Sequence, residues 1–134
     1  MLDDNFIAVQ NNAIRIGKLI VCGSRGWTPN GTEEDIKIYH RELIRMKMSL
    51  DEMSKIRGED DSVIAMTHYP PFNVSLCNNE MTDLLMQYNL DAVVYGHLHG
   101  KDCRAEKLIV KDDTSFYLTS CDLIDNTLIK ILEI

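Results

Sequence analysis

The sequence predicts an α/β fold in which parallel β-α-β units are followed by antiparallel strands. Three observations predict it. A long amphipathic helical pattern follows the first β-rich runs, a second β-α-β pattern comes next, and only strand patterns follow residue 99. The chain has 134 residues, of which 45% are hydrophobic, enough for one domain with a core. We therefore expect residues 1–134 to form a single domain.

The chain is expected to open with a β-hairpin. Two runs rich in β-forming residues, Phe6 to Gln10 and Ile14 to Cys22, flank Asn11-Asn12, a dipeptide that suits a hairpin turn. The second run ends in a segment with two glycines, Gly23 to Trp27, which predicts a turn where the strand ends.

A single long helix is predicted from about Glu33 to Ile56. Thr32 is a good N-cap, and the acidic first turn suits the positive end of the helix dipole. His40 lies off the apolar stripe and is expected at the surface. We expect the stripe to pack on the sheet of the same chain, although alone it would also suit a coiled coil. The stripe consists of Ile36, Tyr39, Leu43, Met46, Leu50 and Met53.

A second β-α-β unit follows. The apolar runs Val63 to Thr67 and Asp91 to Tyr95 flank a helical pattern between Asn78 and Leu90, with Asn78 or Asn79 as its N-cap. Such crossovers are right-handed and make the flanking strands parallel. The carboxyl ends of both strands should therefore meet at one edge of the sheet.

The last part of the chain favours strands alone. Three are predicted: Lys107 to Lys111, Phe116 to Ser120 and Thr127 to Ile134, with a turn at Asp112-Asp113. We expect these strands either to extend the parallel sheet or to form a second sheet.

Three of the four histidines follow predicted strands. His68 comes directly after one strand, and His97 and His99 come after the next, so the crossover should bring His68 and His97 together. Imidazole is the commonest metal-binding side chain. The pattern therefore indicates a metal site formed by His68, His97 and His99. The alternative is that each histidine caps a strand and bonds to backbone groups.

Arg25 is the candidate substrate-binding residue. The strand that ends at Cys22 should bring Ser24, Arg25 and Trp27 to the same edge, where open α/β sheets bind ligands. A planar guanidinium there could orient a substrate phosphate. The other interpretation is that Arg25 pairs with a surface carboxylate.

Charge and composition argue against several classes of partner. The formal net charge is -7 and no run of Lys or Arg occurs, which disfavours a nucleic-acid backbone or an anionic membrane as partner. An anionic substrate would need bound cations to neutralise it. No apolar stretch approaches the roughly 18 residues of a membrane span, and no Cys-x-x-Cys pair occurs. The first five residues show neither the positive nor the apolar region expected of a signal peptide. We expect a soluble cytoplasmic protein with reduced thiols.

Two segments carry a resemblance to a known family. Thr67-His68-Tyr69-Pro70-Pro71 and Gly96-His97-Leu98-His99-Gly100 resemble the last two metal-binding motifs of the calcineurin-like metallophosphoesterases, in the same order. Cys22 to Trp27 and Tyr117 to Asp122 also resemble segments of bacterial predicted phosphohydrolases of that family.

The resemblance implies a four-layer α/β/β/α sandwich that hydrolyses phosphate esters with two divalent ions, Mn, Fe or Zn. In the family pattern, His68 and His97 would bind one ion and His99 the other. Two such ions clamp an in-line displacement at phosphorus and generate its nucleophile.

The earlier motifs of the family are absent from this sequence. These are an Asp-x-His, a Gly-Asp-x-x-Asp and a Gly-Asn-His followed by Asp or Glu. The chain thus resembles the C-terminal half only, a partial domain for which we expect weak metal occupancy and little catalysis alone. Apolar surface left by the missing half would favour a homo-oligomer. The alternative function is a non-catalytic metal-binding or oligomerisation module.

Overall fold

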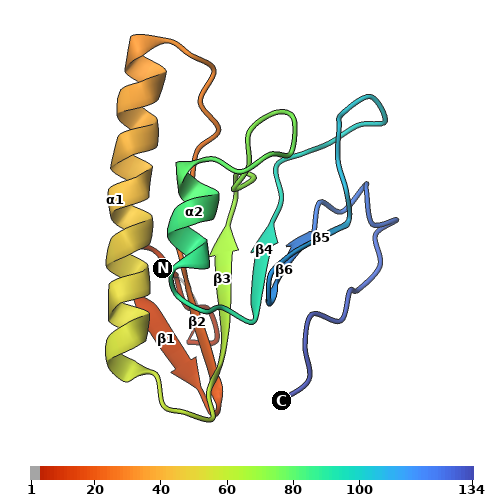
Figure 1. The fold of residues 1–134 in the computed structure, drawn as a ribbon. Coiled ribbons are helices and arrows are strands. Elements are labelled where there is room, and N and C mark those ends of the chain that lie inside the picture. Colours follow the sequence, from red (N-terminus) through yellow and green to blue (C-terminus); the bar gives the residue numbers. More distant parts are fainter. Residues whose placement is uncertain (1–3) are drawn as a thin grey trace.

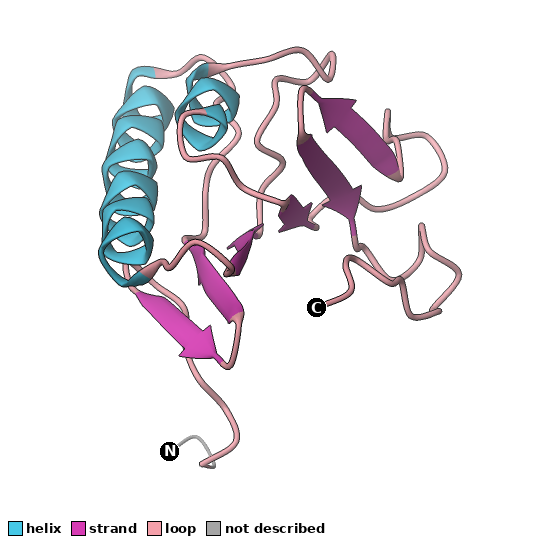
Figure 2. Ribbon diagram, turned by 60° about the horizontal axis from the view of Figure 1, so that its bottom comes forward, coloured by secondary structure: helices cyan, strands magenta, loops and turns pink. Residues whose placement is uncertain are grey.

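The computed structural model describes residues 4–134, which form one mixed six-stranded sheet and two helices (Figure 1). The elements are β1 (Ala13–Ile16), β2 (Leu19–Gly23), α1 (Glu33–Ile56), β3 (Ser62–Thr67), α2 (Glu80–Met86), β4 (Ala92–Tyr95), β5 (Leu108–Lys111) and β6 (Thr114–Leu118). The strand order is β1-β2-β3-β4-β6-β5. Both helices lie on the same side of the sheet (Figure 2).

The centre of the sheet is parallel, which confirms the predicted β-α-β units. β2 pairs with β3, β3 with β4, and β4 with β6, all in parallel. The positions that face the helices are fully buried, among them Val63, Val93 and Phe116. α2 is shorter than the predicted helix and is capped by Asn79. The carboxyl ends of β2, β3 and β4 therefore meet at one edge.

α1 begins and ends where the sequence predicted. Thr32 caps it by accepting a hydrogen bond from the N–H of Asp35 at 3.2 Å. The buried face differs in part from the apolar stripe, because Ile36 is 41% exposed whereas Glu42 and Ser49 are fully buried. Asp35, Glu42 and Ser49 recur every seven residues on the same face of α1. This polar column contacts the chain that leaves β2.

The predicted opening hairpin was wrong in its position. Phe6 to Gln10 forms no strand, and the run Ile14 to Cys22 contains the turn between β1 and β2. Ile16 pairs with Leu19, so the turn is Gly17-Lys18. Gly17 makes this turn possible because its φ of +62° carries no steric cost for a residue without a Cβ.

The tail extends the same sheet and forms no second one within residues 4–134. β5 and β6 form an antiparallel hairpin, and β6 runs parallel to β4. The strands after residue 99 were predicted to be antiparallel, and of these only β5 runs against the parallel centre of the sheet. Thr127 to Ile134 was predicted as a strand, and that prediction was wrong. Alternating apolar residues form a strand only where a neighbour supplies hydrogen-bond partners. No described strand pairs with this segment.

The sheet face opposite the helices is open in the described part of the chain. Ile16, Met66 and Val110 lie on this face and are 56%, 45% and 61% exposed. The segment from Ile7 to Val9 borders this face across a cavity of about 860 Å³. One sheet with one helix layer accounts for two of the four layers that the family resemblance implies.

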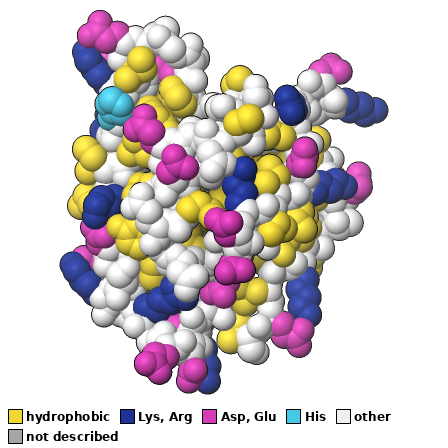
Figure 3. Space-filling view, viewed as in Figure 1, with side chains coloured by type: hydrophobic (Ala, Val, Ile, Leu, Met, Phe, Trp, Pro, Cys, Tyr) yellow, Lys and Arg dark blue, Asp and Glu magenta, His cyan; other side chains and the backbone are white. Residues whose placement is uncertain are grey.

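The surface seen in Figure 3 carries charges of both signs. Acidic and basic side chains are interspersed there, with apolar side chains between them. The helices among residues 4–134 are too short or too polar to cross a membrane.

Candidate functional site

Two of the three candidate histidines meet at the carboxyl edge of the sheet. His68 follows β3 and His97 follows β4, two paired strands in which Thr67 lies opposite Tyr95. The carbonyl of His68 accepts a hydrogen bond from the N–H of Gly96 at 3.1 Å, which joins the segments that follow the two strands. Nε2 of His68 then lies 3.1 Å from Nδ1 of His97.

This contact is itself a hydrogen bond between the two ring nitrogens, and its length also suits two nitrogens that share one cation. Tetrahedral geometry with zinc–nitrogen bonds near 2.05 Å places two ligand nitrogens roughly 3.3 Å apart. The 3.1 Å between His68 and His97 is close to that value. Burial, together with the nearby imidazoles of His68 and His99, lowers the pKa of His97 from its ordinary value. A neutral imidazole is the form that binds a metal ion.

The backbone of His97 is unusual. Its φ is +68°, in the left-handed region that a side chain with a Cβ rarely adopts. Such conformations persist where the surrounding structure enforces them, and they cluster at functional sites. Here the conformation turns the chain two residues after the end of β4.

His99 does not join this pair. Its Nδ1 lies 2.7 Å from Oδ1 of Asp122, and Oδ2 of Asp122 accepts a hydrogen bond from the N–H of Gly100 at 2.9 Å. The Gly100 hydrogen bond and then the His99 contact hold the pKa of Asp122 below its ordinary value. Sequence reasoning assigned Asp122 no role, although its place soon after β6 was a signal. Within residues 4–134, no three His, Cys, Asp or Glu side chains converge on one ion position.

Aromatic rings surround the histidine pair. Tyr69 lies between Trp27 and His97, with ring centroids 4.7 Å and 4.2 Å away, and its ring also meets the edge of His68 at 5.0 Å. Tyr69 therefore limits the rotation of both imidazoles. The pair lies between two hollows, since His68 lines the large cavity and His97 lines another of about 390 Å³.

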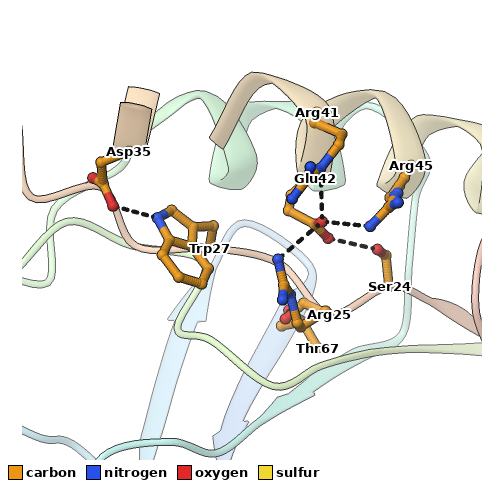
Figure 4. Close-up of polar contacts among 8 residues, drawn as sticks. All are labelled: Ser24, Arg25, Trp27, Asp35, Arg41, Glu42, Arg45 and Thr67. Atoms are coloured by element: carbon orange, nitrogen blue, oxygen red, sulfur yellow. Dashed lines mark hydrogen bonds and ion pairs between the residues drawn. The ribbon is translucent and has the colours of Figure 1, made fainter. Parts of the chain in front are cut away.

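Arg25 is attached to the site through its backbone. Its carbonyl accepts hydrogen bonds from the N–H groups of His68 and Tyr69, at 3.0 Å and 3.1 Å, and from the hydroxyl of Thr67 at 2.9 Å. Its guanidinium points toward α1, lies 5.0 Å from the ring of Trp27 and pairs with Glu42 at 3.3 Å (Figure 4). The side chain remains 45% exposed.

The polar column of α1 holds the segment after β2. Glu42, fully buried, accepts hydrogen bonds from Ser24, Arg25 and Arg45 at 3.2, 3.3 and 2.9 Å. Trp27 donates its indole N–H to Asp35 at 2.7 Å, as Figure 4 shows.

A further polar contact and a close approach fix the end of β2. Ser49, also on α1, accepts the N–H of Gly23 at 2.7 Å. A Cβ at Gly23 would collide with the carbonyl of Met66, so glycine is required there. α1 thus holds the segment that carries Arg25 in place. Because the Arg25 carbonyl accepts the N–H of His68, α1 also positions the chain after β3 indirectly.

Comparison with known proteins identifies a family. A family model described as calcineurin-like phosphoesterase matches residues 4–101, a range that includes His68, His97 and His99 and ends before Asp122. No curated protein and no solved structure matches this chain. The match covers well over half of the 134 residues. The chain belongs to the calcineurin-like phosphoesterase family.

Proposed function

We propose that this chain supplies the histidine-bearing edge of a metal-dependent phosphoester hydrolase. In this proposal His68 and His97 hold one divalent ion and His99 holds a second, with Mn, Fe or Zn as the ions. The observation that carries it is the 3.1 Å between Nε2 of His68 and Nδ1 of His97. The family match supports phosphate esters as the substrate class.

The residues of this chain would orient the imidazoles that bind the ions. Hydrogen bonds from the Arg25 carbonyl fix the backbone of His68, and Tyr69 limits the rotation of both imidazoles. The chain carries a net charge of -7, so it cannot attract a phosphate ester without local positive charge. Divalent ions, when bound, supply that charge and Lewis-acid activation of the ester.

We propose that this chain is the C-terminal part of the hydrolase and is nearly inactive alone. Three imidazoles are fewer ligands than two ions require, and the carboxylate-containing motifs of the family are absent from the sequence. The expected result with chromogenic phosphomonoester and phosphodiester substrates and Mn²⁺ is no turnover above the metal alone. Turnover that His97→Ala abolishes would contradict this part of the proposal.

Metal binding tests the proposal directly. Calorimetric titration with Zn²⁺ and with Mn²⁺ should show binding that weakens roughly tenfold or more in His68→Ala and in His97→Ala. His40→Ala is the matched control, because His40 is the fourth histidine and lies exposed on α1. Equal affinity in all three variants and the wild type would refute histidine ligation.

A second candidate is a non-catalytic module that binds a single ion. The observation that favours it is that His99 contacts Asp122 and not the histidine pair. The stoichiometry of the same titration distinguishes the two candidates. Two ions per chain support the hydrolase, whereas one ion lost in both His68→Ala and His97→Ala but retained in His99→Ala supports the module.

A further inference from the structure

Asp122 joins two loops at the carboxyl edge of the sheet. One carboxylate oxygen contacts Nδ1 of His99 at 2.7 Å, and the other accepts the N–H of Gly100 at 2.9 Å. The exits of β6 and β4 are themselves connected, because Thr119 donates its N–H and its hydroxyl to the carbonyl of Tyr95, at 2.8 and 3.0 Å. The position of Asp122 beside His99 therefore follows from the pairing of the two strands.

The contact with Asp122 determines which nitrogen of His99 carries the proton. An ionised carboxylate only accepts hydrogen bonds, so Nδ1 of a neutral His99 must be the donor. Nε2 is then left with a free lone pair, which is the group that a metal ion needs. His97 differs, because its Nδ1 is the nitrogen that faces His68.

We propose that Asp122 is a positioning residue that keeps His99 in the Nδ1–H tautomer and makes Nε2 its metal-binding nitrogen. The metal part of this inference rests on the proposed function. A carboxylate that accepts the second ring N–H of a metal-binding histidine orients the ring and raises its basicity. The two histidines of one loop would then bind through opposite nitrogens, His97 through Nδ1 and His99 through Nε2.

The simpler alternative is that Asp122 only stabilises the loop of His99 and Gly100 and does not determine the tautomer of His99. Two substitutions separate the alternatives. In Asp122→Asn the backbone N–H of Gly100 can only donate, so the amide oxygen should stay with Gly100 and the amide N–H₂ should face His99. Nδ1 of His99 must then accept, which moves the proton to Nε2 and blocks metal binding there. Asp122→Ala removes the fastening but leaves the tautomer of His99 free.

The tautomer is measured first, in the metal-free protein. Long-range ¹H–¹⁵N spectra at about pH 8, where an ordinary imidazole is neutral, report which ring nitrogen is protonated. His99→Gln assigns the signal among the four histidines. We expect the Nδ1–H form in the wild type and the Nε2–H form in Asp122→Asn. The Nε2–H form in the wild type, or the same tautomer in both proteins, would overturn the proposal.

Zn²⁺ titration, followed at the His99 signal, then tests the metal role. Affinity should fall about 10- to 100-fold in Asp122→Asn and less in Asp122→Ala. If Asp122 only stabilised the loop, Asp122→Ala would bind Zn²⁺ more weakly than Asp122→Asn. That order of affinities would overturn the proposal. The Asp122 side chain is 42% exposed, and circular dichroism should confirm that both variants fold.

The two proposals fail in different ways. A wild-type protein that binds no Zn²⁺ at any histidine would refute the proposed function and the metal role of Asp122 together. A protein that binds Zn²⁺ at His68 and His97 but shows no change of tautomer on substitution of Asp122 would refute only the present inference.

Discussion

The side-chain layer between the sheet and its helices differs from the loops at the carboxyl edge in composition, exposure and backbone geometry. In the layer, Val93 and Phe116 lie on regular strands and are fully buried. At the edge, His68 and His99 are exposed, and His97 has a left-handed backbone. This difference indicates that burial stabilises the fold mainly in the layer, whereas the edge carries the residues of the proposed metal site. Substitutions in the two regions should therefore affect different measurements.

The largest expected effect on stability comes from the buried layer. Phe116 packs against Phe72 with ring centroids 5.0 Å apart. Phe116→Ala leaves a cavity and should lower the free energy of unfolding, measured with urea, by about 3–5 kcal/mol. Tyr117→Ala is the matched control, because the next residue of β6 faces the open side and should lose only about 1 kcal/mol. Equal losses would show that the two faces of the sheet do not differ.

Glu42 connects the two regions and should have an intermediate effect. Glu42→Ala removes the carboxylate that accepts hydrogen bonds from Ser24, Arg25 and Arg45. We expect a loss of about 1.5–3 kcal/mol in the free energy of unfolding. The control is Glu52→Ala, since Glu52 pairs with Lys55 in solvent and this exposed pair should contribute little to the free energy of unfolding. A loss no greater than in the control would contradict the anchoring role of Glu42.

An ion pair between Arg15 of β1 and Asp61 predicts a pH dependence of smaller size. The side-chain hydrogen bond from Arg15, with the N–H of Gly58, lowers the pKa of Asp61 to about 2 from 3.8. Because the folded pKa is the lower one, this contribution is complete above about pH 4 and is lost as the pH falls toward 2. Asp61→Asn should lack this component of acid destabilisation in unfolding measurements. If the free energy of unfolding fell with pH in Asp61→Asn as it does in the wild type, the proposed contribution of the Arg15–Asp61 pair would be contradicted.

The smallest expected change in the free energy of unfolding is an increase, and it concerns His97. His97 has a φ of +68°, and glycine adopts this conformation without steric cost. His97→Gly should therefore raise the free energy of unfolding by about 0.5–1 kcal/mol while it weakens metal binding. His97→Ala retains the Cβ and serves as the control, with stability close to the wild type. A destabilised His97→Gly would show that the imidazole contributes to the fold.

The sequence predicted the elements of the fold that depend on local signals and missed those that depend on distant neighbours. α1 was predicted to the residue, because its cap and apolar period are local signals, and parallel β3 and β4 followed from the crossover rule. The turn at Gly17-Lys18 was missed because one glycine interrupts a continuous β-rich run. The strand predicted over 127–134 was wrong because pairing depends on neighbours that no local pattern specifies.

At the edge, the meeting of His68 and His97 was predictable from strand order, whereas the partners of His99 and Arg25 were not. Asp122 is 23 residues from His99, and Glu42 is 17 residues from Arg25. Glu42 lies next to the predicted apolar position Leu43 and has no sequence signal of burial. Contacts of this kind arise from the packing of α1 and the exit of β6, which the periodicity of the sequence does not encode.

The most direct test of the central claim is a crystal structure of the chain grown with Zn²⁺, with anomalous differences measured at the zinc absorption edge. The account predicts a peak between Nε2 of His68 and Nδ1 of His97, about 2.0–2.1 Å from each nitrogen. Zinc found only at surface carboxylates or at His40, with the His68 and His97 nitrogens still 3.1 Å apart and free of metal, would contradict it.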